Sequence, residues 1–318
     1  MKHLKKTSLA AMMSVAVAMP SMAETRITYK SAKTTSSYYQ MAVQISEAMK
    51  AGSSGDIIVT VEESQGSVQN VMEVRARGGD YVFTTPPALV RLAKAGKAMF
   101  KGKGDPKFDN IRALFPIPSL TMHFVVSSKS GVTDFSGLEG KKILLGKGSF
   151  GAKEGAKYLK LFGLEGKVEL ANVELSNAVP ALKNGQIDGF VTAGSWPAPN
   201  VIEAAASTGV TVLSLSPDQI KASKRSELTI PAGTYAGQKS DITTTSLPVV
   251  AYTTTAMDDD TAYALTKTYW EQKETMGASA AWWNGVDKGL MANIEGKIHP
   301  GAVRYYTEKG YNLSDAQK

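Results

Sequence analysis

The chain has 318 residues, with 36 Lys and Arg against 29 Asp and Glu, three His and no Cys. This length can form one large domain or two ordinary ones. A hydrophobic fraction of 43% with 20% charged residues is typical of a globular protein and excludes wholesale disorder. The lack of Cys excludes disulfide scaffolds, thiolate metal sites and cysteine nucleophiles, and three His leave little material for histidine-based catalysis.

Residues 1–23 have the pattern of a secretory signal peptide. Lys2, Lys5 and Lys6 form a basic start, a short apolar run follows, and small residues at its end predict cleavage after Ala23. The apolar run is about half of the ~20 residues that a membrane span needs, which favours a signal over an anchor. Without the three lysines the formal charge falls from +7 to +4 (33 minus 29), too little to predict nucleic-acid binding. We therefore expect an exported, periplasmic protein that does not itself span the membrane.

The rest of the chain alternates short strands with amphipathic helices, the pattern of an α/β fold. The first group of expected strands lies at 26–30, 57–61 and 81–83, with helices starting near residues 38, 67 and 87. The pattern repeats about 110 residues later, with strands at 142–145, within 168–175 and at 187–192, and helices at 152–162 and 177–183. The repetition favours two similar lobes, although generic α/β alternation would give a comparable pattern.

The loops that follow these strands are rich in Ser, Thr and Gly. In an open parallel sheet, ligands bind beyond the carboxyl ends of the strands, next to helix N-termini. Hydroxyls and free backbone N–H groups at these positions suit carboxylates or phosphates. Two lobes that face each other would place a small-molecule site between them. Ser67 is expected to be the N-cap of its helix.

One loop matches a cofactor motif. Gly146, Gly148 and Gly151 have the spacing of the dinucleotide fingerprint and follow an expected strand. Soluble NAD is not expected in an exported compartment, and Gly155 is expected to weaken packing of the next helix on the sheet. We therefore favour an anion-binding loop that uses the same geometry, and we expect no cofactor.

The remaining polar residues give weaker indications. His123 and His299 are far apart in sequence and are expected to have structural roles. The acids at 258–260 lack the spacing of a calcium loop and are expected to begin a helix at 261–274. The basic residues Lys221, Lys224 and Arg225 are expected to form a solvated face.

Several motifs in order along the chain resemble those of one family, the solute-binding proteins of TAXI-type TRAP transporters (TRAP-associated extracytoplasmic immunogenic proteins). The resemblance extends from about Ile27 to Tyr311. The motifs are the Tyr38-Tyr39 pair, Gln65-Gly66-Ser67-Val68-Gln69-Asn70, Gly79-Asp80-Tyr81-Val82-Phe83, Gly148-Ser149, Thr192-Ala193-Gly194-Ser195-Trp196-Pro197, Ile230-Pro231-Ala232-Gly233-Thr234-Tyr235, and His299-Pro300-Gly301-Ala302 with Arg304-Tyr305-Tyr306.

The chain departs from the family pattern at three places. Lys33-Thr34-Thr35 stands where the family usually has glycines, 84–87 replaces a Gln-Ser-Asp type of sequence, and Ser195-Trp196 is bulkier than usual. All three fall at the expected ligand cleft, so they bear on the identity of the ligand rather than on the fold.

The resemblance implies a type II periplasmic-binding-protein fold, in which two Rossmann-like lobes are joined by a hinge and the ligand cleft lies between them. The implied division is a signal peptide at 1–23, the first part of lobe 1 at 24–118, lobe 2 at 119–248, and the rest of lobe 1 at 249–318. The implied crossover strands are 123–127 and 249–253.

The resemblance also implies a function. The protein would capture a small organic anion, glutamate-like or a dicarboxylate, and deliver it to a TRAP membrane permease, without enzymatic activity, cofactor or metal. Two alternatives remain, a periplasmic enzyme on the same scaffold and a receptor for peptide or protein.

The expected ligand contacts combine the strand-end loops with the family motifs. They are Thr34, Ser36, Ser37, Tyr38, Gly66, Ser67, Thr84, Thr85, Ser149, Phe150, Thr192, Gly194 and Trp196. Ser67 could equally be only an N-cap and Tyr38 only a core residue. Lys33, Lys153, His123 and Arg304 are candidate charged partners whose direction the sequence does not give.

Overall fold

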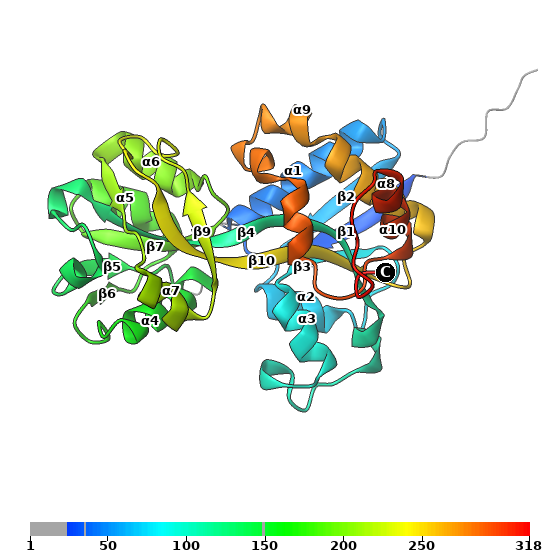
Figure 1. The fold of residues 1–318 in the computed structure, drawn as a ribbon, viewed down its shortest axis with the longest axis horizontal. Helices are drawn as coiled ribbons and strands as arrows, with labels where there is room; N and C mark the ends of the chain where they lie inside the picture. The colour runs from blue at the N-terminus through cyan, green and yellow to red at the C-terminus, as the bar shows by residue number, and fades with distance from the viewer. Residues whose placement is uncertain (1–23, 35, 148–149) are drawn as a thin grey trace, which may run out of the picture.

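The computed structural model describes residues 24–34, 36–147 and 150–318. The expected signal peptide and its cleavage site, Thr35, Ser149 and the side chain of Phe150 lie outside the described residues. The described chain forms two bodies that are joined by two long strands, β4 and β10 (Figure 1). We call the body that carries β1, β2 and β3 lobe 1, and the body that carries β5, β6 and β7 lobe 2.

Lobe 1 is built from both ends of the described chain. Its strands are β1 (Thr25–Lys30), β2 (Ile57–Glu62) and β3 (Tyr81–Thr85). Its helices are α1 (Ser37–Gly52), α2 (Ser67–Glu73), α3 (Pro87–Lys94), α8 (Asp259–Glu271), α9 (Lys273–Gly277) and α10 (Pro300–Glu308). The acids at 258–260 begin α8 as expected, with Asp258 as the N-cap.

Lobe 2 comes from the middle of the chain. Its strands are β5 (Lys142–Leu144), β6 (Glu169–Ala171), β7 (Gly189–Gly194), β8 (Val210–Val212) and β9 (Ser226–Ile230). Its helices are α4 (Phe150–Leu161), α5 (Ala178–Lys183), α6 (Pro199–Thr208) and α7 (Pro217–Ser223). Each expected strand and helix of the repeated pattern therefore has a counterpart, and boundaries differ by a few residues.

One continuous sheet passes through both lobes. Its order is β2-β1-β3-β10-β4-β7-β5-β6, with β8 added beside β4 and β9 beside β10. The β1, β2 and β3 strands are parallel to one another, and so are β5, β6 and β7. β4 (Ile111–Ser127) and β10 (Ile242–Thr254) are antiparallel to each other and contribute to both halves. The topology is that of two parallel α/β sheets joined by an antiparallel pair.

The hydrophobic core divides at the same place. The lobe 1 core takes its buried side chains from 27–117 and 249–313, whereas two clusters in lobe 2 take theirs from 122–242. Leu120 is partly buried against the lobe 1 core, and Met122 belongs to a lobe 2 cluster. The change from one core to the other therefore falls between Leu120 and Met122 of β4.

The two crossing strands are longer than the sequence predicts. The expected segments 123–127 and 249–253 lie inside β4 and β10, but 123–126 pair with β7 in lobe 2, and 250–252 pair with β3 in lobe 1. Pro116 and Pro118 interrupt the strand pattern of β4 in sequence, because proline lacks the N–H of a central strand. They are accommodated where β4 pairs only with β10 among the described strands.

Three tyrosine hydroxyls hold the other edge of β4 in lobe 1. Tyr306 of α10 donates to the Leu114 carbonyl (2.8 Å), Tyr269 of α8 to that of Pro116 (2.8 Å), and Tyr38 of α1 to that of Pro118 (2.7 Å). All three tyrosines are buried. We call these three bonds the tyrosine ladder. It fixes β4 to three helices of lobe 1 as far as residue 118.

Across the described residues, no helix is both long and apolar enough to cross a membrane.

Candidate functional site

The junction of the two lobes brings two predicted ligand residues together. Gly194 ends β7 of lobe 2, and Ser37 begins α1 of lobe 1. A Cβ built on Gly194 would lie 2.4 Å from the Ser37 Oγ atom. The Gly194 backbone therefore contacts α1 only because this residue has no side chain. The start of the first helix of lobe 1 and the end of the third strand of lobe 2, 157 positions apart (194 minus 37), meet here.

The start of α1 is fixed by its own polar side chains. The Ser36 side chain accepts a hydrogen bond from the Tyr38 backbone N–H (3.2 Å) and is the N-cap of α1. The Tyr38 side chain is buried, and its hydroxyl is the donor to Pro118 in the tyrosine ladder. Thr34 is exposed, and its N–H lies 3.4 Å from a Glu63 carboxylate oxygen. This loop thus presents Ser37 to lobe 2 while Tyr38 holds α1 to β4.

The predicted residues near the ends of β2 and β3 differ in burial: Gly66 and Ser67 are half-buried, and Thr84 and Thr85 are buried. The N-cap of α2 is Gly66, with a φ of 114°, and not Ser67, so the expected serine cap is wrong. Only glycine adopts such a φ without strain. Thr84 is buried and donates to the Tyr29 hydroxyl (2.9 Å), and the buried hydroxyl of Thr85 has no hydrogen-bond partner among the described residues.

Asn70 of α2 connects the ends of two lobe 1 strands. Its Nδ2 donates to the carbonyls of Ser31 (2.7 Å) and Thr84 (2.8 Å). Its Oδ1 is buried and accepts no hydrogen bond in the part of the chain that the structure describes. The strand-end loops of β1 and β3 are therefore held in one place by a single amide.

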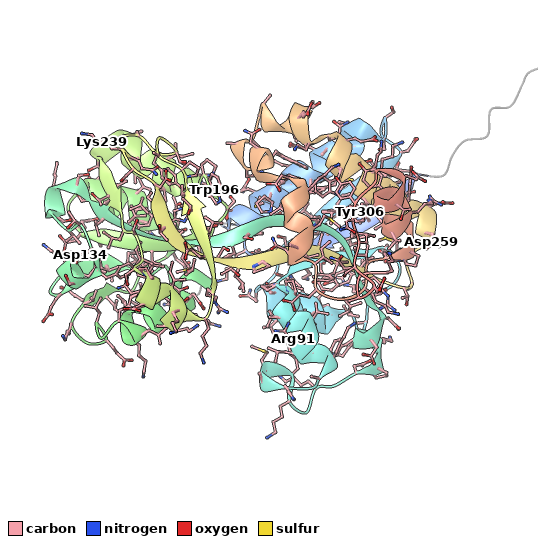
Figure 2. All side chains as sticks on the ribbon, viewed as in Figure 1. Arg91, Asp134, Trp196, Lys239, Asp259 and Tyr306 are labelled. Carbon is pink, nitrogen blue, oxygen red and sulfur yellow. The ribbon has the colours of Figure 1, made fainter. Side chains whose placement is uncertain are left out.

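The remaining described residues predicted in lobe 2 lie in β7, at Thr192, and just after it, at Trp196. Thr192 is buried and lies opposite His123 in the β4 register. Trp196 is half-buried against the lobe 2 core, on the side of lobe 2 that faces lobe 1 (Figure 2). The predicted contacts at Ser149 and the Phe150 side chain lie outside the described residues.

His123 is a structural residue. It is fully buried, its Nε2 lies 2.7 Å from the Tyr235 hydroxyl, and its Nδ1 lies 3.2 Å from the Thr121 carbonyl. The Tyr235 hydroxyl accepts the Ala198 N–H (3.0 Å), so it donates to Nε2, and Nδ1–H donates to the carbonyl. Burial lowers the pKa of His123 to about 4. The imidazole is therefore neutral at pH 7 and cannot be a charged partner for an anion.

The other expected charged partners differ in exposure. Lys153 on α4 is exposed, and Lys33 is half-buried. Arg304 on α10 bonds Asp260 (2.9 Å) and lies over the Tyr263 ring. The neighbouring Asp259 lies on the side of lobe 1 that is away from lobe 2 (Figure 2), so Arg304 is remote from the junction.

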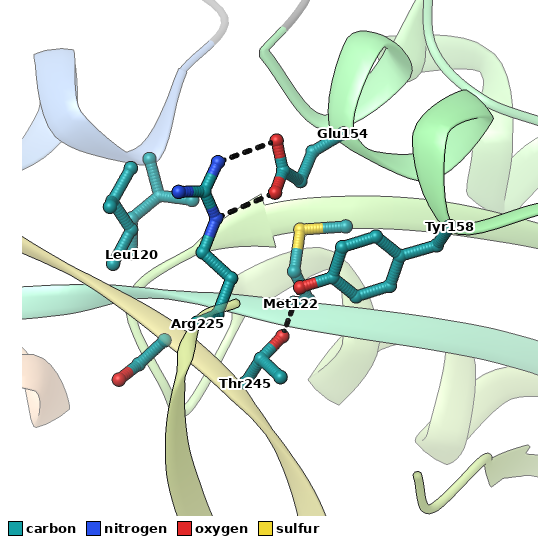
Figure 3. A pocket seen from close by; sticks show the side chains of 8 residues that line it. Leu120, Met122, Glu154, Tyr158, Arg225 and Thr245 are labelled. Atoms are coloured by element: carbon teal, nitrogen blue, oxygen red, sulfur yellow. Dashed lines mark hydrogen bonds and ion pairs between the residues drawn. The ribbon is translucent and has the colours of Figure 1, made fainter. Parts of the chain in front are cut away.

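Arg225 does not belong to a solvated face, contrary to the expectation. Its Nε and Nη2 donate to the two carboxylate oxygens of Glu154 on α4, at 2.7 and 3.1 Å (Figure 3). Glu154 is buried, with 6% of its surface exposed. This hydrogen bonding raises the pKa of Arg225, so the guanidinium stays charged. The side chains are 71 positions apart, and the sequence gives no sign of their pairing.

The ion pair lines a hollow at the base of the junction. The space in it that a water molecule can enter is about 10 Å³, and the hollow is open to solvent. Its lining residues come from α4, from the residue just before β9 and from the crossing strands, and they are Leu120, Met122, Glu154, Tyr158, Arg225, Thr245, Ser246 and Leu247 (Figure 3). Sequence reasoning missed this site. A usable signal was Glu154, a single acid that lies four residues before Tyr158 on the buried face of α4.

Gly155 has the opposite effect from the one expected. A Cβ on Gly155 would lie 3.1 Å from Cγ1 of Val191 on β7. The glycine therefore lets α4 approach the sheet closely, rather than weakening that contact. The close approach helps to bury Glu154, which is the preceding residue.

The fold and the junction define the class of the protein. Two α/β lobes, each with its own core, are joined by two antiparallel crossing strands, which is the type II periplasmic-binding-protein fold. The chain belongs to the NMT1-like family, whose model matches residues 30–310.

Several solved structures are similar to this chain at low identity. The alkanesulfonate-binding protein SsuA of Xanthomonas axonopodis pv. citri, bound to MOPS, is 14% identical over 90% of this chain and 84% of its own, with a TM-score of 0.44. A TRAP periplasmic solute-binding protein of Actinobacillus succinogenes, with bound L-galactonate, is 15% identical over 91% and 88%, with a TM-score of 0.40. A structure from work on glutathione import through GshT in Streptococcus mutans is 13% identical over 84% and 99%, with a TM-score of 0.47.

Proposed function

We propose that this protein is an extracytoplasmic solute-binding protein that captures a small organic anion between its lobes and delivers it to a membrane permease. The observation that carries the proposal is the approach of Ser37 and Gly194, through which the strand-end loops of both lobes meet. Loops of this kind bind anions in parallel α/β folds. Membership of the NMT1-like family agrees with this function.

The proposed lobes are 24–118 with 249–318, and 119–248. The separation of the hydrophobic cores supports this division, because buried side chains from 27–117 and 249–313 form one core and those from 122–242 form two others. Among the described residues, only β4 and β10 carry the chain from one lobe to the other, so rotation of one lobe against the other requires changes in few backbone angles.

Closure of the lobes on a solute would supply the binding free energy. Micromolar affinity requires about 8 kcal/mol. Several charge-assisted hydrogen bonds at about 1.5–3 kcal/mol each meet this requirement after ordering costs. Removal of the anion from water strengthens these bonds further.

The proposed solute is glutamate-like or a dicarboxylate, and the proposed partner is a TRAP-type permease. Both details rest on the resemblance of the strand-end motifs to the TAXI family. We further propose that residues 1–23 direct export to the periplasm and are removed after Ala23. The binding protein would catalyse no reaction and would need no cofactor.

A titration tests the function directly. The change in tryptophan fluorescence and in melting temperature is measured with glutamate, glutamine, 2-oxoglutarate and succinate. An acid at 100 times its dissociation constant should stabilise the protein by about 2.7 kcal/mol. Trp196→Phe should remove the fluorescence change but keep the thermal shift, because Trp196 faces lobe 1.

A response to a sugar or a cation, without one to any organic anion, would reject the anion class. Turnover of the acid would instead favour an enzyme.

A further inference from the structure

The hollow beside Arg225 lies where the two cores meet. Leu120 packs against the lobe 1 core, and Met122 and Tyr158 belong to a lobe 2 core. Thr245, Ser246 and Leu247 come from β10, next to the point at which it crosses between the lobes. A group bound here would contact both lobes at their connection.

The arginine is held in one orientation and still has free donors. A guanidinium has five N–H donors in a planar fork. Two of them bind Glu154, through Nε and Nη2. The other three, on Nη1 and the outer side of Nη2, have no partner among residues 24–34, 36–147 and 150–318. The Arg225 side chain is 26% exposed and lines the hollow.

The charges around the hollow do not cancel. Lys157 lies one turn after Glu154, and its Nζ is 3.5 Å from Glu154 Oε1 and 3.3 Å from the Ser223 carbonyl. Arg225 and Lys157 therefore share one carboxylate, which leaves one positive charge (two minus one). The Coulomb energy of an anion beside this excess charge is larger in a partly buried site than in water. A purely structural ion pair would not require the second cation.

The remaining lining separates into a polar corner and an apolar wall. The Ser246 hydroxyl has no hydrogen-bond partner in the described part of the chain, so it is available as a donor. Tyr158 and Thr245 are bonded to each other through their hydroxyls (2.6 Å), and this bond uses one of the two hydroxyl protons. Leu120 and Met122 supply apolar surface.

The size of the hollow limits what enters it. Whole small-molecule sites usually have about 300–1,000 Å³, whereas the space in this hollow that a water molecule can enter is about 10 Å³. The hollow as it stands therefore holds about one water molecule, and the carboxylate end of a solute would enter it only when the lobes move apart. The rest of the solute would extend toward Ser37 and Gly194.

We propose that Arg225, oriented by Glu154, is the anion-binding residue of the junction, and that it takes the carboxylate end of the solute. Lys157 contributes charge, Ser246 contributes a hydroxyl donor, and Leu120 and Met122 contact the adjacent carbon atoms. The favoured solute is a carboxylic acid with at least one methylene next to the carboxylate, as in succinate or glutamate. This inference rests on the proposed function and names the residues that would select its substrate.

The test compares Arg225→Lys with a matched variant. Lysine keeps the positive charge, but its single ammonium group cannot donate paired hydrogen bonds to Glu154 and to a ligand at the same time. Arg77→Lys is the control, because Arg77 also forms a forked network, with Glu62 and Glu73 in lobe 1, outside the hollow. Affinity for succinate and for its diamide is measured by calorimetry, and melting temperatures show whether each variant folds. Arg225→Lys should weaken succinate binding at least tenfold and reduce the preference for the acid over the diamide.

A second pair of variants changes lysines of α4 and leaves the hydrogen bonds between Arg225 and Glu154 intact. Lys157→Met should weaken succinate binding about threefold or more, whereas Lys160→Met on the same helix, whose partner is the exposed Glu165, should change it less than twofold. If the wild type binds succinate or glutamate and both test variants bind like their controls, the assignment of Arg225 is wrong and the proposed function stands. If the wild type binds no organic acid, the function fails, and the assignment fails with it.

Discussion

Gly194→Ala is a substitution that places a new atom directly at the contact between the two lobes. The new Cβ would lie 2.4 Å from Ser37 Oγ and 3.4 Å from Ser37 Cβ. Favourable contacts between such atoms begin at about 3.5 Å, so the overlap with the hydroxyl is about 1 Å. Because the two residues belong to different lobes, rotation of the lobes away from each other relieves the overlap without disturbing either core.

The expected cost follows from this geometry. Overpacking by one methyl group typically costs about 1–3 kcal/mol. If the approach of the lobes is the ligand-binding arrangement, affinity for succinate or glutamate should fall about 5- to 150-fold. The free energy of unfolding should stay within about 0.5 kcal/mol of the wild type. Small-angle scattering should show a larger radius of gyration for the ligand-bound variant than for the ligand-bound wild type.

A second substitution makes the test specific. Ser37→Ala removes the Oγ that causes the overlap and leaves only the ordinary 3.4 Å contact, so the double variant should recover most of the affinity. Gly104→Ala is the control, because a Cβ there meets nothing within 4 Å. Wild-type binding by Gly194→Ala, or failure of Ser37→Ala to rescue it, would refute the role of this contact.

Three further predictions concern stability. Tyr38→Phe removes the hydroxyl that binds the Pro118 carbonyl and should lower the free energy of unfolding in urea by about 1–3 kcal/mol, because a buried acceptor is left unpaired. The pKa of His123 is about 4 in the folded protein and 6.5 in the unfolded chain, so the unfolded chain binds the proton first as the pH falls. The contribution of the neutral, buried imidazole to the free energy of unfolding is therefore fully present above pH 6.5 and falls by about 3 kcal/mol as the pH drops to 4. His123→Gln should not show this loss. Gly301→Ala places a Cβ 2.0 Å from the Asp259 carbonyl oxygen and should destabilise the protein by about 3 kcal/mol, measured by thermal or urea unfolding.

Each of these has a comparison that can contradict it. Tyr39→Phe alters the next residue, whose hydroxyl makes no hydrogen bond to the described chain, so an equal loss in both tyrosine variants would argue against the Pro118 bond. If wild type and His123→Gln lose stability equally between pH 7 and pH 4, the burial of a neutral imidazole is not the cause. A Gly301→Ala variant as stable as Gly104→Ala would show that α10 can move away from α8 at little cost.

The repeated α/β pattern was predictable, whereas the length of the crossing strands was not. Strands such as 57–61 and 81–83 are rich in β-branched or aromatic residues, and helices such as α1 have regular apolar spacing, so local sequence defines them. β4 contains Pro116 and Pro118, which locally argue against a central strand. Only the tertiary arrangement shows that these prolines lie at an edge.

The candidate site was predictable in part, for a similar reason. Loops after parallel strands converge by topology, so Ser37 and Gly194 could be expected in the same region. The Glu154–Arg225 pair could not, because it depends on how α4 packs against the start of β9. Charge alone suggested a solvated face at Arg225, and only the buried partner changes that interpretation.

The tyrosine ladder also affects how molecules of this protein meet one another. An unpaired strand edge normally offers N–H and carbonyl groups to a strand of another chain, and such pairing leads to aggregation. Along 114–118 of β4, three carbonyls are already occupied by Tyr38, Tyr269 and Tyr306, and two prolines remove N–H donors. This stretch of a 17-residue strand therefore cannot template a cross-β contact while lobe 1 is folded.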